Sequence, residues 1–219
     1  MKKTGIILLV AAVVLTMGSC GNKTQNVPFD NGDSANMTVD STLYGICGEA
    51  TTMNMLQIIV DTGDTLMLDI SSAKDKGQVF GGLQVGDRMA VLPNKSMTGA
   101  LTVINQTTLL GNWVMPNPID GSDEVGISIK EGGVAESIDQ SSIIYRTWRL
   151  SNGRLEIVSV REGASDMEET NIYDIVKLTA DSLVYQDSEE VFEYGRQKPK
   201  ETYGENVKLE ESSYDDFKM

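Results

Sequence analysis

The stretch Leu109-Leu110-Gly111-Asn112-Trp113 (LLGNW) introduces a long series of short apolar segments that continues to about residue 200. Apolar and polar residues alternate within each segment, and turn residues separate one segment from the next. Asn152-Gly153 lies between two of these segments and is a strong signal for a two-residue hairpin. Residues 109–200 are therefore predicted to form an eight-stranded up-and-down barrel. Its strands are the one that carries Trp113, followed by Glu124–Ile129, Val134–Ile138, Ile143–Leu150, Arg154–Val160, Asn171–Leu178, Leu183–Tyr185 and Val191–Arg196.

A Gly-x-Trp motif at the start of such a barrel resembles the signature of the lipocalin family. The resemblance implies that Trp113 closes one end of the barrel and that an arginine near the last strand packs across it. Arg196 matches that arginine, and a guanidinium lying over an indole is attractive. The pair is predicted to be structural, not catalytic. The segment lacks the length, the disulfide and the long mouth loop of typical lipocalins, and it is most similar to the short lipocalin-like domains of bacterial lipoproteins.

A second set of strands precedes the motif, in residues 37–105. Leu56, Ile58 and Val60 alternate with Gln57, Ile59 and Asp61, and Asp61–Asp64 has the composition of a hairpin loop. Further strands are predicted at Thr38–Cys47, Gly77–Leu83, Asp87–Leu92 and Ala100–Ile104, and no convincing amphipathic helix is found. The spacing predicts a small barrel of OB or SH3-like type, and the sequence leaves both topologies open. The predicted fold class is therefore all-β, with a small N-terminal barrel followed by a short lipocalin-like barrel.

The boundary between the two predicted domains falls near Asn105-Gln106-Thr107-Thr108. This segment is polar and has no marked preference for or against β-strand structure. Each half has its own alternating strands and turn signals, so each is expected to bury its own core and to fold independently.

The first residues have the composition of an export signal. Lys2 and Lys3 precede an apolar run from Ile6 to Thr16, which is short for a membrane span and typical of a signal peptide. Met17-Gly18-Ser19-Cys20 resembles the bacterial lipobox, in which the cysteine is acylated and becomes the new N-terminus. Residues 1–19 are therefore predicted to be a lipoprotein signal peptide. Cys20 is the predicted lipid attachment site, and several acyl chains would anchor it stably in a membrane.

The segments that flank the predicted domains are polar. Residues 20–36 are rich in Asn and Gly and are interpreted as a flexible tether. Asp33-Ser34-Ala35 matches a short sequence that some bacteria O-glycosylate, which makes Ser34 a candidate acceptor. No Asp follows Cys20 to suggest retention in the inner membrane, so the outer membrane is the expected location. Residues 201–219 are interpreted as a solvated acidic tail.

Composition excludes several classes of function. The 219 residues carry a formal charge of −14, which argues against a nucleic-acid partner. The chain has no His, so Ser-His or Cys-His nucleophiles and His metal sites are excluded. The acidic run at residues 120–124 does not match an EF-hand and is interpreted as a turn. With Cys20 lipidated, Cys47 has no partner for a disulfide and is expected to be a buried thiol. No metal, no cofactor and no enzymatic activity are predicted.

Two functions from different classes remain open. The first is a binding module whose barrel holds a small apolar molecule between aromatic walls. The second is a scaffold or interaction protein with filled barrels that acts through its surface and whose protein partner is unknown. A cavity of several hundred Å³ favours the first function, and a filled interior favours the second. The candidate wall residues are Tyr145, Trp148, Tyr173, Tyr185, Phe192 and Tyr194.

Overall fold

The computed structural model describes residues 39–198 except 122, 140–141, 162 and 164–166. The predicted signal peptide 1–19, Cys20, the tether through residue 36, Ser34 and the acidic tail 201–219 lie outside the described residues and stay predictions. The described residues from Val39 to Lys198 belong to one compact unit. Among the described helices, none has the length and apolar character needed to cross a bilayer.

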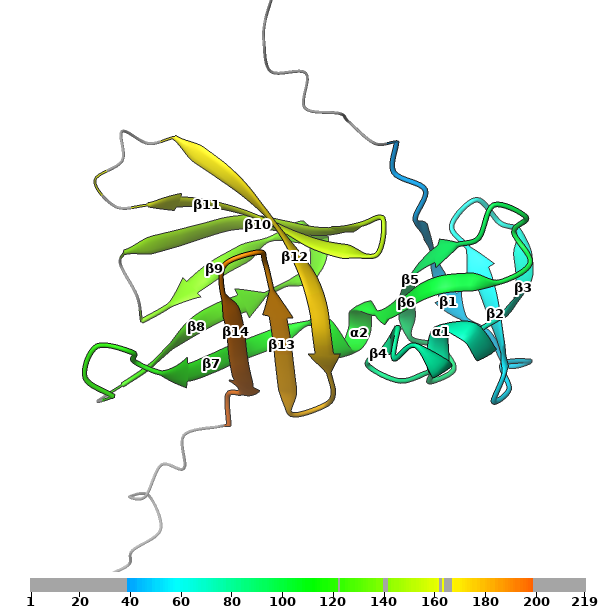
Figure 1. Ribbon diagram of the computed structural model, residues 1–219, viewed down its shortest axis with the longest axis horizontal. Coiled ribbons are helices and arrows are strands. Elements are labelled where there is room, and N and C mark those ends of the chain that lie inside the picture. Colours follow the sequence, from blue (N-terminus) through cyan, green and yellow to red (C-terminus); the bar gives the residue numbers. More distant parts are fainter. Residues whose placement is uncertain (1–38, 122, 140–141, 162, 164–166, 199–219) are drawn as a thin grey trace, which may run out of the picture. The chain divides into compact units, whose positions relative to one another are not determined.

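The N-terminal half of the described chain forms a six-stranded sheet in the order β3-β2-β1-β5-β6-β4 (Figure 1). Neighbouring strands are antiparallel except β4 and β6, which run parallel. A parallel bridge between Asp69 and Gly99 joins the end of β3 to the start of β6, so the sheet curls toward closure. An OB or SH3-like classification of this sheet stays a prediction. The strands are β1 (Leu43–Cys47), β2 (Met55–Val60), β3 (Thr65–Asp69), β4 (Val79–Phe80), β5 (Arg88–Pro93) and β6 (Ala100–Asn105).

Two short helices differ from the sequence-based expectation. Helix α1 (Ser71–Asp75) follows β3, and the strand predicted at residues 77–83 is reduced to the two residues of β4. Helix α2 (Gln106–Leu109) occupies the predicted boundary, and the Asn105 side chain caps it by accepting a hydrogen bond from the Thr108 amide at 2.9 Å. Helices this short do not complete a hydrophobic period, which is why the sequence pattern did not reveal them.

The C-terminal half forms an eight-stranded antiparallel sheet in the order β10-β11-β12-β13-β14-β7-β8-β9. The first and last strands of this half, β7 and β14, pair with each other, as an up-and-down barrel requires. Asn152 and Gly153 both have positive φ values, 49° and 77°, and form the predicted hairpin turn between β10 and β11. The strands are β7 (Gly111–Pro116), β8 (Glu124–Ile129), β9 (Ala135–Ile138), β10 (Ile143–Ser151), β11 (Arg154–Arg161), β12 (Glu168–Leu178), β13 (Ser182–Gln186) and β14 (Val191–Arg196).

The ends of that strand order, β9 and β10, are joined by fewer backbone pairs than the other neighbours. An isolated bridge links Val134 to Thr147. The Ser137 hydroxyl donates to the Ile143 carbonyl at 2.6 Å and accepts from the Tyr145 amide at 2.9 Å. A side chain therefore supplies part of the ladder at this seam, and the eight strands form a nearly closed barrel. The all-β class and the eight-stranded barrel that the sequence predicts are confirmed.

Two hydrophobic clusters hold these elements together. The smaller one lies in the N-terminal sheet and contains mainly aliphatic side chains, such as Leu56, Ile58 and Leu68. The larger one fills the barrel and also includes Phe80 and Ile104 of the N-terminal sheet. The two sheets thus share part of a core. Independent folding of the two halves stays a prediction.

Candidate functional site

Trp113 and Arg196 meet where the last strand of the barrel pairs with the first. They are partners in the register of β7 and β14, and the Arg196 Cζ atom lies 4.1 Å from the centroid of the Trp113 ring. Trp113 is fully buried, and its indole N–H donates to the Leu109 carbonyl at 2.7 Å. The structure therefore brings together the two residues that the sequence singled out. A barrel-closing role for this pair stays a prediction.

Arg196 also donates hydrogen bonds to backbone carbonyl groups near helix α2. Its terminal nitrogens donate to the Leu110 carbonyl at 2.9 Å and to the Thr108 carbonyl at 2.7 Å, and its Nε donates to the Ala180 carbonyl. Carbonyl groups at the end of a helix have no partner within the helix, and a guanidinium is a suitable donor for them. Arg196 thus stabilises the segment that connects the two sheets.

The glycine of the Gly-x-Trp motif is explained by the same guanidinium. Gly111 has a φ of +131°, and a Cβ atom placed on it would lie 2.3 Å from an Arg196 nitrogen. Any side chain at Gly111 would therefore displace the guanidinium from the indole.

A cluster of aromatic rings lies in the interior of the barrel. Tyr185 lies 4.7 Å from Tyr173, 5.3 Å from Phe192 and 5.5 Å from Tyr194, measured between ring centroids. The Tyr185 hydroxyl donates to the Tyr194 hydroxyl at 3.2 Å, and Tyr145 is also buried. Four of the six predicted wall residues thus contact one another.

Burial changes the acidity of these phenols. It raises the pKa of Tyr173 to about 12 and raises the pKa values of Tyr185 and Tyr194 well above the usual value of 10.0. The interior tyrosines therefore stay neutral at physiological pH and act as packing groups and hydrogen-bonding groups.

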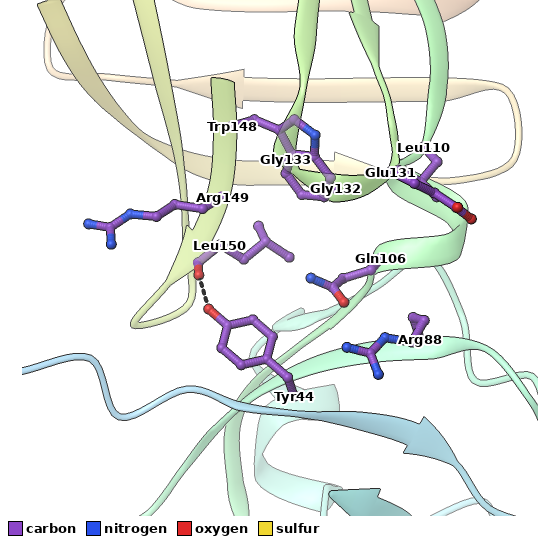
Figure 2. A pocket seen from close by; sticks show the side chains of 10 residues that line it. All are labelled: Tyr44, Arg88, Gln106, Leu110, Glu131, Gly132, Gly133, Trp148, Arg149 and Leu150. Carbon is purple, nitrogen blue, oxygen red and sulfur yellow. Dashed lines mark hydrogen bonds between the residues drawn. The ribbon is translucent and has the colours of Figure 1, made fainter. Parts of the chain in front are cut away.

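A pocket of about 500 Å³ lies beside the barrel, where residues of the N-terminal sheet and α2 approach β10 and the turn after β8 (Figure 2). Its wall combines Tyr44 of β1, Arg88 of β5, Gln106 of α2 and the 3-10 turn η1 (Glu131–Gly133) with residues of β10. Trp148, the remaining predicted wall residue with a buried ring, contributes to this pocket, and its indole N–H donates to the Lys130 carbonyl at 2.8 Å. The other lining residues are Leu110, Arg149 and Leu150.

The cations of the pocket already have carboxylate partners. Arg88 forms two parallel hydrogen bonds with Asp61, at 2.6 and 2.9 Å, and these bonds lower the pKa of the Asp61 carboxyl. Arg149 pairs with Glu156 through its Nε, and Figure 2 shows the Arg149 side chain extending away from the pocket. Both guanidinium groups are therefore paired, whereas Glu131, which also lines the pocket, forms no ion pair among the described residues.

Tyr44 holds one side of the pocket in place. Its hydroxyl donates to the Leu150 carbonyl, the contact drawn as a dashed line in Figure 2, and it also lies 3.3 Å from a carboxylate oxygen of Asp40. Burial and the neighbouring Asp40 raise the pKa of Tyr44 to about 12. Partial burial acts to raise the pKa of Asp40, but hydrogen bonds from Thr42, Asn152 and Tyr44 together lower it.

Gln106 differs from the other polar side chains of the pocket. In Figure 2 its amide points toward Leu150, across the pocket. Within the part of the chain that the structure describes, this amide makes no internal hydrogen bond. Sequence analysis assigned no role to Gln106, Tyr44 or Leu150, because they come from distant segments and no local motif connects them.

Metal binding has no support in the described residues. Across residues 39–198, apart from the short gaps, no group of three or more Cys, Asp or Glu residues is placed to hold an ion. Cys47 is a buried free thiol, as expected.

A comparison with protein families matches the lipocalin-like family over residues 105–197, the barrel and the helix that precedes it. The chain belongs to the lipocalin-like family through this domain. Proteins of this family are generally not enzymes.

A solved structure of a lipocalin-like protein from Bacteroides thetaiotaomicron VPI-5482 is 33% identical in sequence to the part of this chain that it matches. The match covers 41% of this chain and 97% of that one, with a TM-score of 0.38. Among curated proteins, none matches the sequence.

Proposed function

We propose that this protein is a lipid-anchored lipoprotein of the bacterial cell envelope whose lipocalin-like domain binds a small ligand in the pocket beside the barrel. The signal-like residues 1–19 and the lipobox-like sequence before Cys20 support the anchor. Acyl chains on Cys20 would hold the protein in a membrane, and we propose the outer membrane as its location.

The pocket of about 500 Å³ is the observation that carries the binding function. Ligand sites commonly measure about 300–1,000 Å³ and combine an apolar wall with a few polar groups. Leu110, Trp148 and Leu150 supply the apolar wall, and Gln106 supplies a side-chain amide that has no hydrogen-bond partner among the described residues. Because aromatic rings fill the barrel interior, this pocket supports ligand binding better than the interior does.

Native mass spectrometry of the full chain extracted from membranes tests both parts of the proposal. We expect an added acyl mass and, separately, a retained small molecule. Cys20→Ser should remove the acyl mass and release the protein into the soluble fraction or leave its signal uncleaved. Processing and membrane partitioning of Cys20→Ser like the wild type would disprove the anchor.

Leu110→Trp should fill the pocket and remove the retained mass, with the acyl mass unchanged. Val191→Trp is the matched control, because Val191 is exposed on β14 and does not line the pocket. Circular dichroism should show that both variants are folded. Equal retention of the small molecule by both variants would show that the pocket is not the binding site.

A scaffold is the second candidate function, and the filled interior of the barrel favours it. A scaffold would act through its surface and would be purified with a protein partner and no small molecule. The same mass spectra distinguish the two functions, because a protein partner adds a far larger mass than a ligand.

A further inference from the structure

The pocket beside the barrel has a neighbouring depression at the turn η1. A second depression of about 420 Å³ adjoins it and shares Gly132, Gly133, Trp148 and Arg149 as lining residues. The second depression continues along the outer surface of the barrel to Val158 and Thr170. The two depressions therefore meet at the pair of glycines, and together they fit an elongated ligand.

The charges around both depressions disfavour an anionic ligand. Arg88 is held by two hydrogen bonds to Asp61, and Arg149 is paired with Glu156. An anionic ligand would have to displace these carboxylates from the guanidinium groups, and the Glu131 carboxylate in the wall of the first depression would repel it. An uncharged ligand would leave both ion pairs intact.

The uncommitted polar groups disfavour a purely aliphatic ligand. The Gln106 amide in the first depression and the Thr147 and Thr170 hydroxyls in the second make no internal hydrogen bonds among the described residues. A hydrocarbon chain would cover these groups without replacing the hydrogen bonds that they make with water. Each of these groups can both donate and accept.

An extended peptide fits this surface less well. A peptide binds beside a sheet by forming main-chain hydrogen bonds with a free strand edge. Here the Leu150 carbonyl accepts from the Tyr44 hydroxyl, and the Lys130 carbonyl accepts from the Trp148 indole. Two of the backbone acceptors beside the first depression are thus already occupied.

We propose, on the basis of the ligand-binding function above, that the two adjoining depressions bind an uncharged oligosaccharide of at least two rings. Its hydroxyl groups both donate and accept and would satisfy Gln106, Thr147 and Thr170. Its apolar ring faces would lie on the apolar side chains Leu110 and Val158. One ring would occupy each depression, and the chain would pass over Gly132 and Gly133.

Gly132 provides a selective test of this arrangement. It has a φ of +75°, a Cβ atom added there would meet nothing within 4 Å, and a side chain would add bulk to a residue that lines both depressions. Asn tolerates this backbone region better than most residues, so Gly132→Asn should fold. Gly121→Asn is the matched control, because Gly121 has a φ of +68°, is equally open and lines neither depression.

The experiment applies the full-length wild type and both variants to immobilised uncharged oligosaccharides, to the same sugars bearing a uronate, and to a fluorescent fatty acid. We expect wild type and Gly121→Asn to bind uncharged oligosaccharides more tightly than monosaccharides. Gly132→Asn should bind them at least about tenfold more weakly. Its affinity for monosaccharides should change less, because a single ring does not cross the glycines.

Preferential binding of the uronates or of the fatty acid would overturn the oligosaccharide proposal, as would equal binding of oligosaccharides by Gly132→Asn and Gly121→Asn. Failure of the wild type to bind any of the three probes would overturn it as well. The mass spectra separate this failure from that of the proposed function. A retained small molecule that Leu110→Trp removes would leave the binding function in place.

Discussion

The two cores of this protein are built from different side chains. The N-terminal sheet buries aliphatic residues such as Leu56, Ile58 and Val103, whereas the barrel buries Trp113 and a group of tyrosines. An eight-stranded barrel encloses a space just wide enough to be filled by side chains, and large rings fill it with few contributors. A buried tyrosine needs a hydrogen-bond partner for its hydroxyl group. The core of the barrel therefore contains more polar groups than the core of the N-terminal sheet.

The cores also differ in how self-sufficient they are. The smaller cluster lies wholly within the N-terminal sheet, whereas the larger cluster includes Phe80, Ala90 and Ile104 from that sheet. The barrel thus depends on its neighbour for part of its burial. Each of the two sets of strands has its own alternation of apolar and polar residues. Side chains from both sets nevertheless pack into one hydrophobic cluster near helix α2, which connects them.

Removal of the N-terminal sheet should have the largest effect, and it tests whether the barrel depends on that sheet for part of its core. A chain that starts at Thr108 should still give a β-type far-UV spectrum and a cooperative melt. It should melt at a lower temperature than the whole chain, because it loses the contacts of Phe80, Ala90 and Ile104. Circular dichroism during heating measures both properties. An unfolded product would show that the two halves form a single folding unit.

Trp113→Ala should cost about 3–5 kcal/mol of unfolding free energy, because it leaves a large cavity in the barrel core. Leu56→Ala in the aliphatic core is the comparison and should cost about 2–5 kcal/mol. Urea denaturation followed by circular dichroism provides both values. A cost below about 1 kcal/mol for Trp113→Ala would contradict a central role for this ring.

Arg196→Ala should cost about 1–3 kcal/mol, because carbonyl groups around α2 lose their donors and one face of the Trp113 ring is uncovered. A double-mutant cycle with Trp113→Ala should show coupling, since contacting residues are not additive. Additivity within about 0.3 kcal/mol would mean that the guanidinium and the indole do not interact in solution.

Tyr185→Phe should have the smallest effect at neutral pH, about 0.5–1.5 kcal/mol for the hydrogen bond to Tyr194. Its effect should depend on pH. Burial raises the pKa of Tyr185 in the folded state above the 10.0 of an exposed phenol, so its stabilising contribution is complete below pH 10 and is lost as the pH rises further.

The variant lacks this ionisation and should therefore lose less stability than wild type above pH 10. Urea denaturation at a series of pH values measures the difference, and Phe192→Leu is a control that changes ring packing without removing a titrating group. Parallel losses of stability in wild type and Tyr185→Phe would show that Tyr185 does not titrate with unfolding.

Much of the barrel could be predicted from the sequence, because each of its strands has a local signal. The alternation of residues 143–161 and the Asn152-Gly153 turn predict β10, β11 and their hairpin, and the structure has all three. The two helices could not be predicted in the same way. The four residues of α2 depend on the Asn105 cap and on carbonyl groups that Arg196 satisfies from far along the chain.

The candidate site was the least predictable feature. Sequence analysis placed the predicted ligand among aromatic walls inside the barrel, and those rings contact one another instead. The pocket beside the barrel depends on Tyr44, Gln106 and Leu150, which no spacing rule connects. Side-chain alternation shows which residues face inward, but it does not show whether the inward rings leave space between them.

The amino-acid sequence by itself determined the all-β class and the order of the barrel strands, because local alternation and turn chemistry specify strands and their succession. The meeting of Trp113 with Arg196 was implied by the resemblance of the Gly-x-Trp motif to the lipocalin signature. Only the tertiary structure decided that the barrel is filled, that the two sheets share a core and that a pocket lies beside η1. These features depend on how side-chain volumes from distant segments fit together, and packing of that kind has no local signature in the chain.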